Sequence, residues 1–269
     1  MAEINFAGKR TFYGIGGRDW QPGQPVVLLI HGAGATHAAW ALQSRALAHH
    51  GWNVAAPDLP GHGYSENRAE IATMEDFSHW LEEFLAALRC QEAVIIGHSL
   101  GGGLAVTFAA TEAKRVRALV LVGVGARMTV NAALLKDCAD NPARAMQFIT
   151  AFSHARPTHL GGSPSPGNWL IGADFTLLAG ESAEVLNRDF LACHRWDGTS
   201  LASQVKCPTL VLTGEGDRMT SLTVGRKLAE LIPGAQFQSV PRAGHMAMVE
   251  APRDVLKKIR AFLATVAPE

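Results

Sequence analysis

Five short apolar runs, separated from one another by longer segments, most strongly limit how this chain can fold. They are rich in Val, Ile, Leu and Ala and cover residues 26–30, 54–56, 93–96, 118–122 and 209–213. Continuous apolar runs of this length are typical of strands that are buried on both faces of a parallel sheet. The alternation predicts an α/β fold, with a mostly parallel central sheet flanked by helices. The residues before Pro25 favour an antiparallel lead-in with a turn at Gly16-Gly17.

The segments between these runs carry the spacing and the end signals of helices. Apolar side chains recur at helical intervals across residues 77–88, and Thr73 with Asp76 forms a cap pair directly before them. A second apolar stripe stops at Pro233, and a third follows Pro252, because proline is favoured at the first position of a helix. These signals predict helices that alternate with the strands.

One long stretch breaks the alternation. Residues 126–205 contain helical fragments but no run that is typical of a central strand. We therefore expect a core made of residues 1–125 and 206–269, with residues 126–205 forming a helical insertion. Within it, residues 161–168 are mostly Gly, Ser and Pro and lack apolar periodicity, so we expect this loop to be locally unstable.

Composition and charge exclude several classes of protein. Apolar residues make up 48% of the chain, which excludes a disordered polypeptide, and 24 basic residues balance 24 acidic ones. A net charge of zero means that the chain has no excess of basic residues to bind nucleic acid or an anionic membrane, so we expect neither as a partner. The chain has neither a signal-peptide pattern nor an apolar run of the roughly 20 residues that span a bilayer. The sequence predicts a soluble, cytoplasmic protein, and whether it forms a homodimer is left open.

The spacing of cysteine and histidine gives no sign of a metal centre. None of the four cysteines belongs to a C-x-x-C pair, which excludes a zinc knuckle and a dithiol redox motif. The H-E-x-x-H pattern of zinc hydrolases is also absent. We expect reduced thiols in a reducing cytoplasm, and an activity that needs no metal and no cofactor.

The sequence Gly97-His98-Ser99-Leu100-Gly101 carries the clearest chemical signal. It follows the apolar run 93–96 and leads into the start of a helix, which is the setting of a nucleophile elbow. The turn is sharp, so the residues flanking the serine must be small, as Gly97 and Gly101 are. An elbow raises its serine at the carboxyl edge of the sheet, where open α/β folds hold their sites. Ser99 is therefore the candidate nucleophile.

A serine hydroxyl needs a base, and the base needs an acid that orients it. In proteins with an elbow, the chain order is serine, then aspartate or glutamate, then histidine. Asp217 follows the run 209–213, and His245 follows residues 237–240, so both fall at strand ends on the same edge as Ser99. Glu215 is the alternative acid, although we expect it to be a turn residue.

Acyl transfer also needs donors for the negative charge that develops on the substrate oxygen. In elbow proteins one donor is the backbone N–H after the nucleophile, here that of Leu100. The other comes from the loop after the run 26–30, whose small residues let the backbone approach closely; we expect it to be the N–H of Ala33. Trp40, shortly after this loop, either lines the pocket or fills the core.

The chain resembles the α/β-hydrolase fold superfamily over nearly its whole length. The motifs that carry the resemblance are the His31-Gly32 turn, residues 58–65, the elbow, residues 214–217 and residues 244–252. The resemblance implies a catalytic triad of Ser99, Asp217 and His245. It also implies that residues near 126–205 form a cap over the site. Within the superfamily, the chain is similar to enol-lactonase-like and carboxylesterase members.

Particular residues favour some chemistries of this superfamily over others. Epoxide hydrolases and haloalkane dehalogenases use an aspartate at the elbow, so Ser99 argues against both. Carbon–carbon bond hydrolases often have a tryptophan after the histidine and an arginine in the cap. Here Met246 follows the histidine, whereas Arg195-Trp196 in the cap keeps that alternative open.

The resulting hypothesis is a serine hydrolase that cleaves a small, mostly apolar carboxylic ester or lactone through an acyl-enzyme intermediate. The partner is then a small-molecule substrate, with Trp40, Arg195, Trp196 and Met246 as candidate binding residues. Two alternatives remain. One is a carbon–carbon bond hydrolase of the β-diketone type, and the other is a non-catalytic ligand receptor on the same fold.

Overall fold

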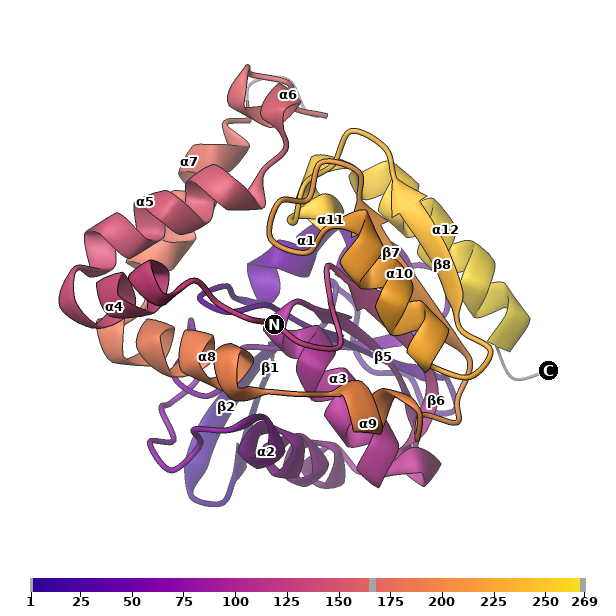
Figure 1. Ribbon diagram of the computed structural model, residues 1–269. Coiled ribbons are helices and arrows are strands. Elements are labelled where there is room, and N and C mark those ends of the chain that lie inside the picture. The colour runs from indigo at the N-terminus through magenta and orange to yellow at the C-terminus, as the bar shows by residue number, and fades with distance from the viewer. Residues whose placement is uncertain (1, 165–167, 267–269) are drawn as a thin grey trace.

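A sheet of eight strands forms the centre of the computed structural model, which describes residues 2–164 and 168–266 (Figure 1). The strands are β1 (Ala2–Phe6), β2 (Lys9–Gly14), β3 (Val26–Ile30), β4 (Asn53–Pro57), β5 (Ala93–His98), β6 (Val116–Val122), β7 (Thr209–Gly214) and β8 (Gln236–Val240). Their order is β1-β2-β4-β3-β5-β6-β7-β8. The β1–β2 and β2–β4 pairs are antiparallel, and the other pairs are parallel. The predicted α/β fold with a mostly parallel sheet is confirmed.

The five apolar runs form the central strands β3 to β7, and the antiparallel lead-in is the hairpin of β1 and β2. The hairpin turn lies at Ala7-Gly8, where φ is 47° and 73°, and not at Gly16-Gly17. The two glycines form a separate turn after β2. The turn at Ala7-Gly8 was missed because residues 2–6 before it alternate in polarity and carry no continuous apolar run.

Helices cover the sheet on both faces. They are α1 (Ala41–Ala48), α2 (Met74–Ala87), α3 (Leu100–Thr111), α4 (Ala132–Asp140), α5 (Pro142–Ser153), α6 (Arg156–His159), α7 (Leu170–Ala179), α8 (Ala183–Arg195), α9 (Thr199–Ala202), α10 (Leu222–Leu231), α11 (Ala247–Glu250) and α12 (Pro252–Val266). Three local signals are confirmed. The Thr73 hydroxyl accepts from the Asp76 N–H while the Asp76 carboxylate accepts from the Thr73 N–H, α10 ends just before Pro233, and α12 begins at Pro252.

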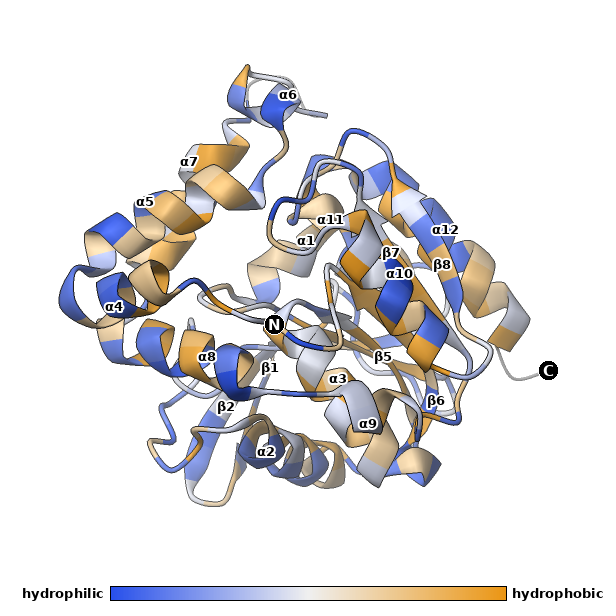
Figure 2. Ribbon diagram, in the orientation of Figure 1, coloured by the Kyte–Doolittle hydropathy of each residue, from blue (hydrophilic) through white to orange (hydrophobic). Residues whose placement is uncertain are grey.

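Alternate residues of each central strand enter two separate apolar clusters. In β3, Leu28 and Ile30 pack toward α2, α3 and α10, whereas Val27 and Leu29 pack toward α1, α11 and α12. Figure 2 shows that α2 and α12 carry hydrophilic residues next to hydrophobic ones, as amphipathic helices on a buried sheet do. Burial on both faces explains why the strands read as continuous apolar runs.

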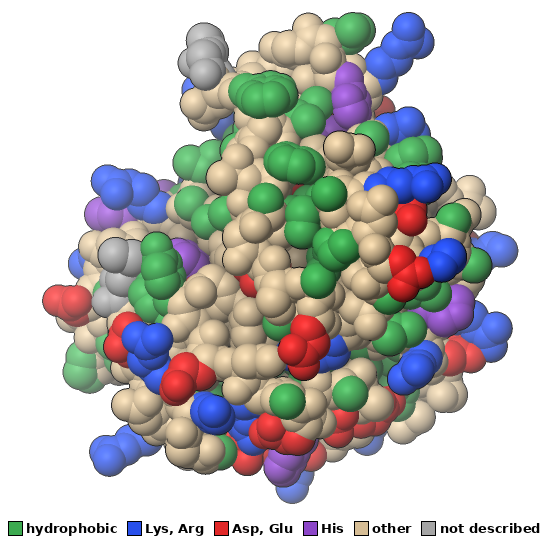
Figure 3. Space-filling model, turned by 90° about the vertical axis from the view of Figure 1, so that its left-hand side faces the viewer, with side chains coloured by type: hydrophobic (Ala, Val, Ile, Leu, Met, Phe, Trp, Pro, Cys, Tyr) green, Lys and Arg blue, Asp and Glu red, His purple; other side chains and the backbone are tan. Residues whose placement is uncertain are grey.

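The chain between β6 and β7 forms a helical layer at one end of the sheet, on the left of Figure 1. Helices α4, α5, α7 and α8 share a small apolar cluster of their own, made of Leu134, Cys138, Ala145, Met146, Ile149, Leu178, Leu186 and Phe190. We call α4 to α8 the cap from here on. Figure 3 shows hydrophobic side chains gathered on the upper part of the face that the cap presents. Within the cap, Leu160 and Trp169 are 78% and 74% exposed.

The C-terminal part of the expected insertion packs with the core. Ala192, Cys193, Trp196, Ala202 and Val205 belong to the cluster that contains α2 and α3. The packing boundary therefore lies near residue 192, earlier than the expected boundary at 205. Our expectation for the loop at 161–168 partly concerns residues outside those described, and it stays a prediction.

Two structural findings bear on the setting in which the chain works. All four cysteines are free thiols. Across residues 2–164 and 168–266, no helix is both long enough and apolar enough to cross a membrane.

Candidate active site

Ser99 lies at the sharp turn between β5 and α3, at the carboxyl edge of the sheet. Its φ of 50° falls in the left-handed region, where a residue with a Cβ atom is strained. The flanking glycines are needed because the turn is crowded. A Cβ on Gly97 would lie 2.3 Å from the Gly101 carbonyl oxygen, and one on Gly101 would lie 2.5 Å from the His31 carbonyl oxygen. The Ser99 side chain is thus held at the edge by sterics on both sides.

Asp217 and His245, which follow β7 and β8, are joined by a buried hydrogen bond. Nδ1–H of His245 donates to Oδ2 of Asp217 at 2.9 Å. The other oxygen, Oδ1, accepts from the N–H groups of Met219 at 2.8 Å and Thr220 at 2.7 Å. This arrangement fixes the carboxylate and leaves Nε2 of His245 as the atom that can take a proton. The alternative acid, Glu215, is exposed and accepts from the Ser239 hydroxyl instead.

The charge of Asp217 tunes the His245 imidazole. Burial lowers the pKa of His245, but the charge and hydrogen bond of Asp217, with the charges of Asp174 and Glu250, outweigh burial and raise the pKa above its ordinary value. The imidazolium that a general base becomes is therefore stabilised at this site.

His98, next to Ser99, supports the loop that carries His245. Its Nε2 lies 3.1 Å from the His245 carbonyl oxygen, so Nε2–H donates to that carbonyl. Burial, together with the nearby His245, holds the pKa of His98 well below its usual range. His98 is therefore neutral and acts through position. Nothing in the sequence marks His98 for this contact, because its partner lies 147 residues away.

The two predicted oxyanion donors are available. Neither the Ala33 N–H nor the Leu100 N–H donates to an acceptor in the described part of the chain. The Leu100 amide is free because Leu100 is the first residue of α3, where no helical acceptor exists.

A carboxylate from the cap holds the loop that follows Ala33. Asp189, on α8, is fully buried; its Oδ2 accepts from the Gly34 N–H at 3.2 Å and from His62 Nε2 at 2.8 Å. The Arg188 guanidinium bonds Oδ1. Burial alone would raise the pKa of Asp189, but His62 and Arg188 lower it, and Asp189 in turn raises the pKa of His62 against the effect of burial. The four groups form a buried ionic network between cap and core.

A second carboxylate ties the cap to the loop that carries His245. Glu250 Oε1 accepts from the Gly244 N–H at 2.8 Å. Its Oε2 accepts from the Ala155 N–H at 2.8 Å and from the Thr158 hydroxyl at 2.6 Å. The loop before the predicted base is thereby attached to the start of α6.

A cavity of about 440 Å³ lies between the core and the cap. Ser99, His245 and Ala33 line it from the core. The cap contributes mostly apolar side chains, including Leu134, Phe148, Ile149, Phe152, Leu178 and Phe190. A pocket of this size and character holds a small, largely apolar molecule. Ser99 and His245 therefore line the same cavity.

Of the four predicted binding residues, Met246 lines the cavity and the other three do not. Trp40 is fully buried in the cluster that packs against α1 and α12, so it fills the core. Trp196 is also buried, and its indole N–H donates to the Thr107 hydroxyl at 3.0 Å. Arg195 is exposed at the end of α8. The predictions for Arg195 and Trp196 are wrong because the chain turns from the cap into the core after α8, and for Trp40 the core alternative is the one that the structure shows.

The cavity contains charged residues that sequence reasoning missed, namely Arg127, Asp174 and Arg218. Arg127 forms an ion pair with Asp197. Arg218 lies over the Phe152 ring, 4.6 Å from its centroid. A metal site is a separate matter: within the described ranges, no three His, Cys, Asp or Glu side chains are grouped so that they could hold an ion. The absence of a cofactor stays a prediction.

Comparison with known proteins gives both fold and family. The 2-hydroxymuconate semialdehyde hydrolase of Pseudomonas putida is 31% identical over 281 residues, which cover 97% of this chain and 93% of that protein. The solved enol-lactonase of Burkholderia xenovorans LB400 has a TM-score of 0.88 at 23% identity, covering 98% of this chain and all of that one. A thermophilic esterase from Thermogutta terrifontis has a TM-score of 0.86 at 24% identity, covering 99% of each chain.

The sequence profile described as "Alpha/beta hydrolase family" matches residues 27–258. This match spans most of the chain, and the solved structures above share the observed fold throughout their length. The chain therefore belongs to the alpha/beta hydrolase family.

Proposed function

We propose that this protein is a serine hydrolase that cleaves a small, mostly apolar carboxylic ester or lactone through an acyl-enzyme intermediate, without a cofactor. The observation that carries the proposal is the 2.9 Å hydrogen bond between His245 Nδ1 and Asp217 Oδ2, at a cavity that Ser99 also lines. Acyl transfer requires a nucleophile, a base and an orienting acid; here Ser99 and His245 line one cavity, and Asp217 holds His245 from behind it.

The residues perform the reaction in two halves. Ser99 Oγ attacks the substrate carbonyl carbon while His245 Nε2 takes the hydroxyl proton. The N–H groups of Ala33 and Leu100 stabilise the oxyanion, and Asp217 stabilises the imidazolium. The carbon–oxygen bond then breaks, and His245 protonates the leaving oxygen.

Water completes the cycle. His245 Nε2 takes a proton from water, whose oxygen attacks the acyl carbon. The bond to Ser99 Oγ breaks as His245 returns the proton to Oγ, and the carboxylic acid leaves. The cavity of about 440 Å³ and its apolar cap side chains favour a small substrate with little charge.

A carbon–carbon bond hydrolase is the second candidate, because the 31% identical relative bears the name of a semialdehyde hydrolase. The cap arginine that sequence reasoning assigned to a substrate carboxylate, Arg195, is absent from the cavity. Arg218 lines the cavity, and no carboxylate in the described chain forms an ion pair with it. A substrate carboxylate near Arg218 is therefore the feature that this candidate requires.

The test is turnover of short-chain p-nitrophenyl esters by the wild type and by Ser99→Ala. We expect Ser99→Ala to lose about 10⁴-fold or more in kcat because covalent catalysis is removed while the scaffold stays. Ser203→Ala, at an exposed serine directly after α9, is the matched control and should keep full activity. A serine-directed phosphonate should label only the Ser99 peptide.

Three other outcomes separate the alternatives. Turnover of a β-diketone acid, but not of esters, would favour the carbon–carbon hydrolase. Ester turnover that is equal in the wild type and in Ser99→Ala would refute the assigned nucleophile. No turnover of either class, together with tight binding of a small apolar ligand, would favour the receptor.

A further inference from the structure

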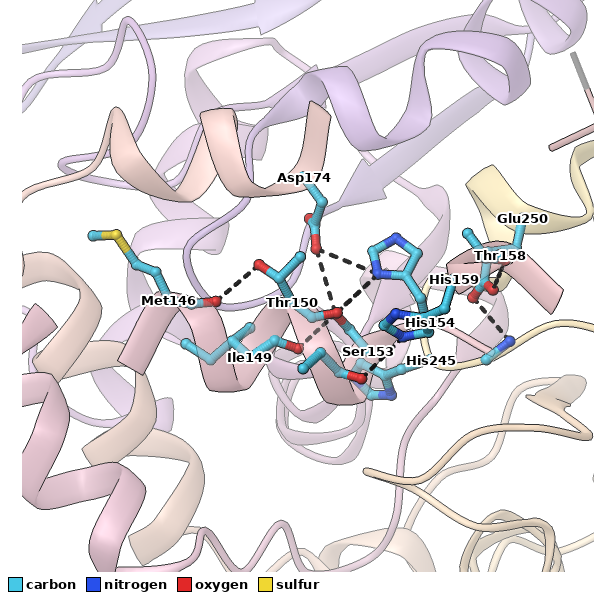
Figure 4. A network of polar contacts seen from close by, with 12 residues as sticks. Met146, Ile149, Thr150, Ser153, His154, Thr158, His159, Asp174, His245 and Glu250 are labelled. Carbon is cyan, nitrogen blue, oxygen red and sulfur yellow. Dashed lines mark hydrogen bonds and ion pairs between the residues drawn. The ribbon is translucent and has the colours of Figure 1, made fainter. Parts of the chain in front are cut away.

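Asp174 brings a carboxyl group into a cavity whose cap side is otherwise mostly apolar. The residue lies on α7, its side chain is 11% exposed, and it lines the same cavity as Ser99 and His245. Figure 4 shows the Asp174 carboxyl pointing toward Ser153 and His154, with His245 in the same group of side chains. The Ser153 carbonyl accepts from the Met246 N–H at 3.1 Å, so this part of the cap packs on the loop that carries His245.

The nearest donor to Asp174 is already engaged elsewhere. The Ser153 hydroxyl lies 3.3 Å from Asp174 Oδ2 but 2.8 Å from the Ile149 carbonyl oxygen. A hydroxyl has one proton to donate, and the shorter distance is the normal one for an O–H donor. The proton therefore goes to Ile149, and the carboxyl receives little from Ser153.

The second neighbour is also committed. His154 Nδ1 lies 3.8 Å from Asp174 Oδ2 but 3.2 Å from the Thr150 carbonyl oxygen. The nearer acceptor is the backbone carbonyl, and 3.8 Å exceeds the length of a hydrogen bond. Within the described ranges, no donor thus lies at a normal hydrogen-bond distance from the Asp174 carboxyl.

Glu250 and Asp189, two other buried carboxylates of the cap–core boundary, are different. Glu250 accepts three hydrogen bonds at 2.6–2.8 Å, and Asp189 accepts from His62 at 2.8 Å as well as from Gly34 and Arg188. Those groups are saturated by the fold itself. Burial raises the pKa of the Asp174 carboxyl, and the opposing influence of His154 and Ser153 does not restore the ordinary value. A buried carboxyl whose partners are this distant costs free energy that a ligand with a closer donor would recover.

We infer that Asp174 is a specificity-determining residue that accepts a hydrogen bond from a hydroxyl group on the substrate. The inference rests on the proposed ester hydrolysis at the same cavity. The ligand is then a small ester or lactone that is mostly apolar but carries one hydroxyl, held by Asp174 while Ser99 attacks the carbonyl. A carboxylate at the same place on the substrate is excluded by repulsion from Asp174 when both groups are ionised.

The experiment compares methyl hexanoate with a series of methyl hexanoates that carry one hydroxyl at successive carbons. The measured quantity is the ratio of kcat/KM for the best hydroxylated ester to that for the parent ester. We expect the wild type to prefer one hydroxylated ester, and Asp174→Leu to lower that ratio by about 10–100-fold, the loss expected for a hydrogen bond to a carboxylate. Asp174→Asn, whose amide oxygen still accepts, should restore part of the preference. Asp140→Asn, an exposed carboxylate of the cap, is the matched control and should leave the ratio unchanged.

A structural role for Asp174 gives a different pattern. Because Ser153 and His154 contact its carboxyl only at long distances, Asp174→Leu should leave the melting temperature unchanged or raise it. A ratio that stays within about twofold of the wild type, or an equal loss for both esters with a lower melting temperature, overturns the inference.

Failure of the proposed function can be told apart from failure of this inference. If the wild type turns over every ester no faster than Ser99→Ala does, the proposed function fails. The inference about Asp174 is then tested by calorimetry, which measures how tightly the same esters bind to Ser99→Ala. Tighter binding of one hydroxylated ester that Asp174→Leu abolishes supports the inference. Equal binding of all the esters, or no binding, refutes it.

Discussion

Replacing Asp189 by asparagine tests how strongly the cap holds the loop that offers the Ala33 N–H. Asp189 is fully buried, and its carboxylate accepts hydrogen bonds from His62, Arg188 and the Gly34 N–H. Removing the charge leaves two basic groups without their anion, and breaking a buried pair costs about 3–5 kcal/mol. Arg188 keeps its hydrogen bonds to the Pro60 carbonyl and to Asn67, and His62 can lose its proton. We therefore expect the free energy of unfolding to fall by an amount at the lower end of this range, about 3 kcal/mol. For a chain of this size, that lowers the melting temperature by about 6–12 °C.

The stability that Asp189→Asn loses should depend on pH in a defined direction. Asp189 has a lowered pKa, so its contribution to stability is present above about pH 4, its unfolded value, and is lost as the pH falls through the folded value. His62 has a raised pKa, so its contribution is complete below about pH 6.5 and is lost as the pH rises through the folded value. The difference between wild type and Asp189→Asn should therefore be largest near pH 5–6.5 and smaller at pH 9.

Urea unfolding at pH 6 and at pH 9 measures the difference in the free energy of unfolding between the wild type and Asp189→Asn. Asp140→Asn, which changes an exposed carboxylate, is the control. Ester kinetics on the same samples should show kcat lower by about 10-fold with KM little changed, since the oxyanion donor is used in the transition state. A loss below about 1 kcal/mol, or one that is equal at pH 6 and pH 9, would refute the ionic network as the link between the cap and this loop.

Three further predictions concern the reaction itself. Asp217→Asn should lower kcat by about 10²–10⁴-fold because His245 loses the partner that fixes its tautomer, whereas Glu215→Gln should change kcat little; reversed effects would mean that Glu215 is the acid. The pKa of His245 is raised above its ordinary value of about 6.5, and the base must be neutral to act. A plot of kcat/KM against pH should therefore rise with a midpoint above about pH 6.5. A midpoint below that value would contradict the claim that Asp217 raises the pKa of His245. Activity should survive prolonged dialysis against a chelator, and loss that one divalent ion restores would count against a metal-free reaction.

The features that the sequence predicted well depend on residues that are close in the chain. The elbow is recognisable from five consecutive residues, and within them a Cβ on Gly97 would clash with the Gly101 carbonyl oxygen of the same turn. The cap pair of α2 needs Thr73 and Asp76, three residues apart. Such signals are readable because the partners are fixed by local geometry.

The features that were missed depend on contacts between distant segments. His62 and Asp189 are 127 residues apart, and no pattern on α8 marks Asp189 as buried. Arg195 and Trp196 were chosen for their chemistry, but the chain leaves the cap at that point, so Trp196 turns into the core. For Asp174 a signal did exist, because it is the single charged residue of the ten-residue helix α7, and a carboxyl in so apolar a segment indicates a special environment.

The two saturated carboxylates also limit how substrate and product can exchange with solvent. Asp189 fastens α8 to the loop after Ala33, and Glu250 fastens the start of α6 to Gly244. Lifting the whole cap would separate Asp189 from Gly34 and His62, and Glu250 from Ala155 and Thr158, at about 1.5–3 kcal/mol for each charged hydrogen bond. Substrate and product must then pass between these two fastenings, along the apolar cap side chains that line the cavity. The rate at which the acid product leaves would accordingly be set by the bulk of those side chains, independently of how fast the bond is cleaved.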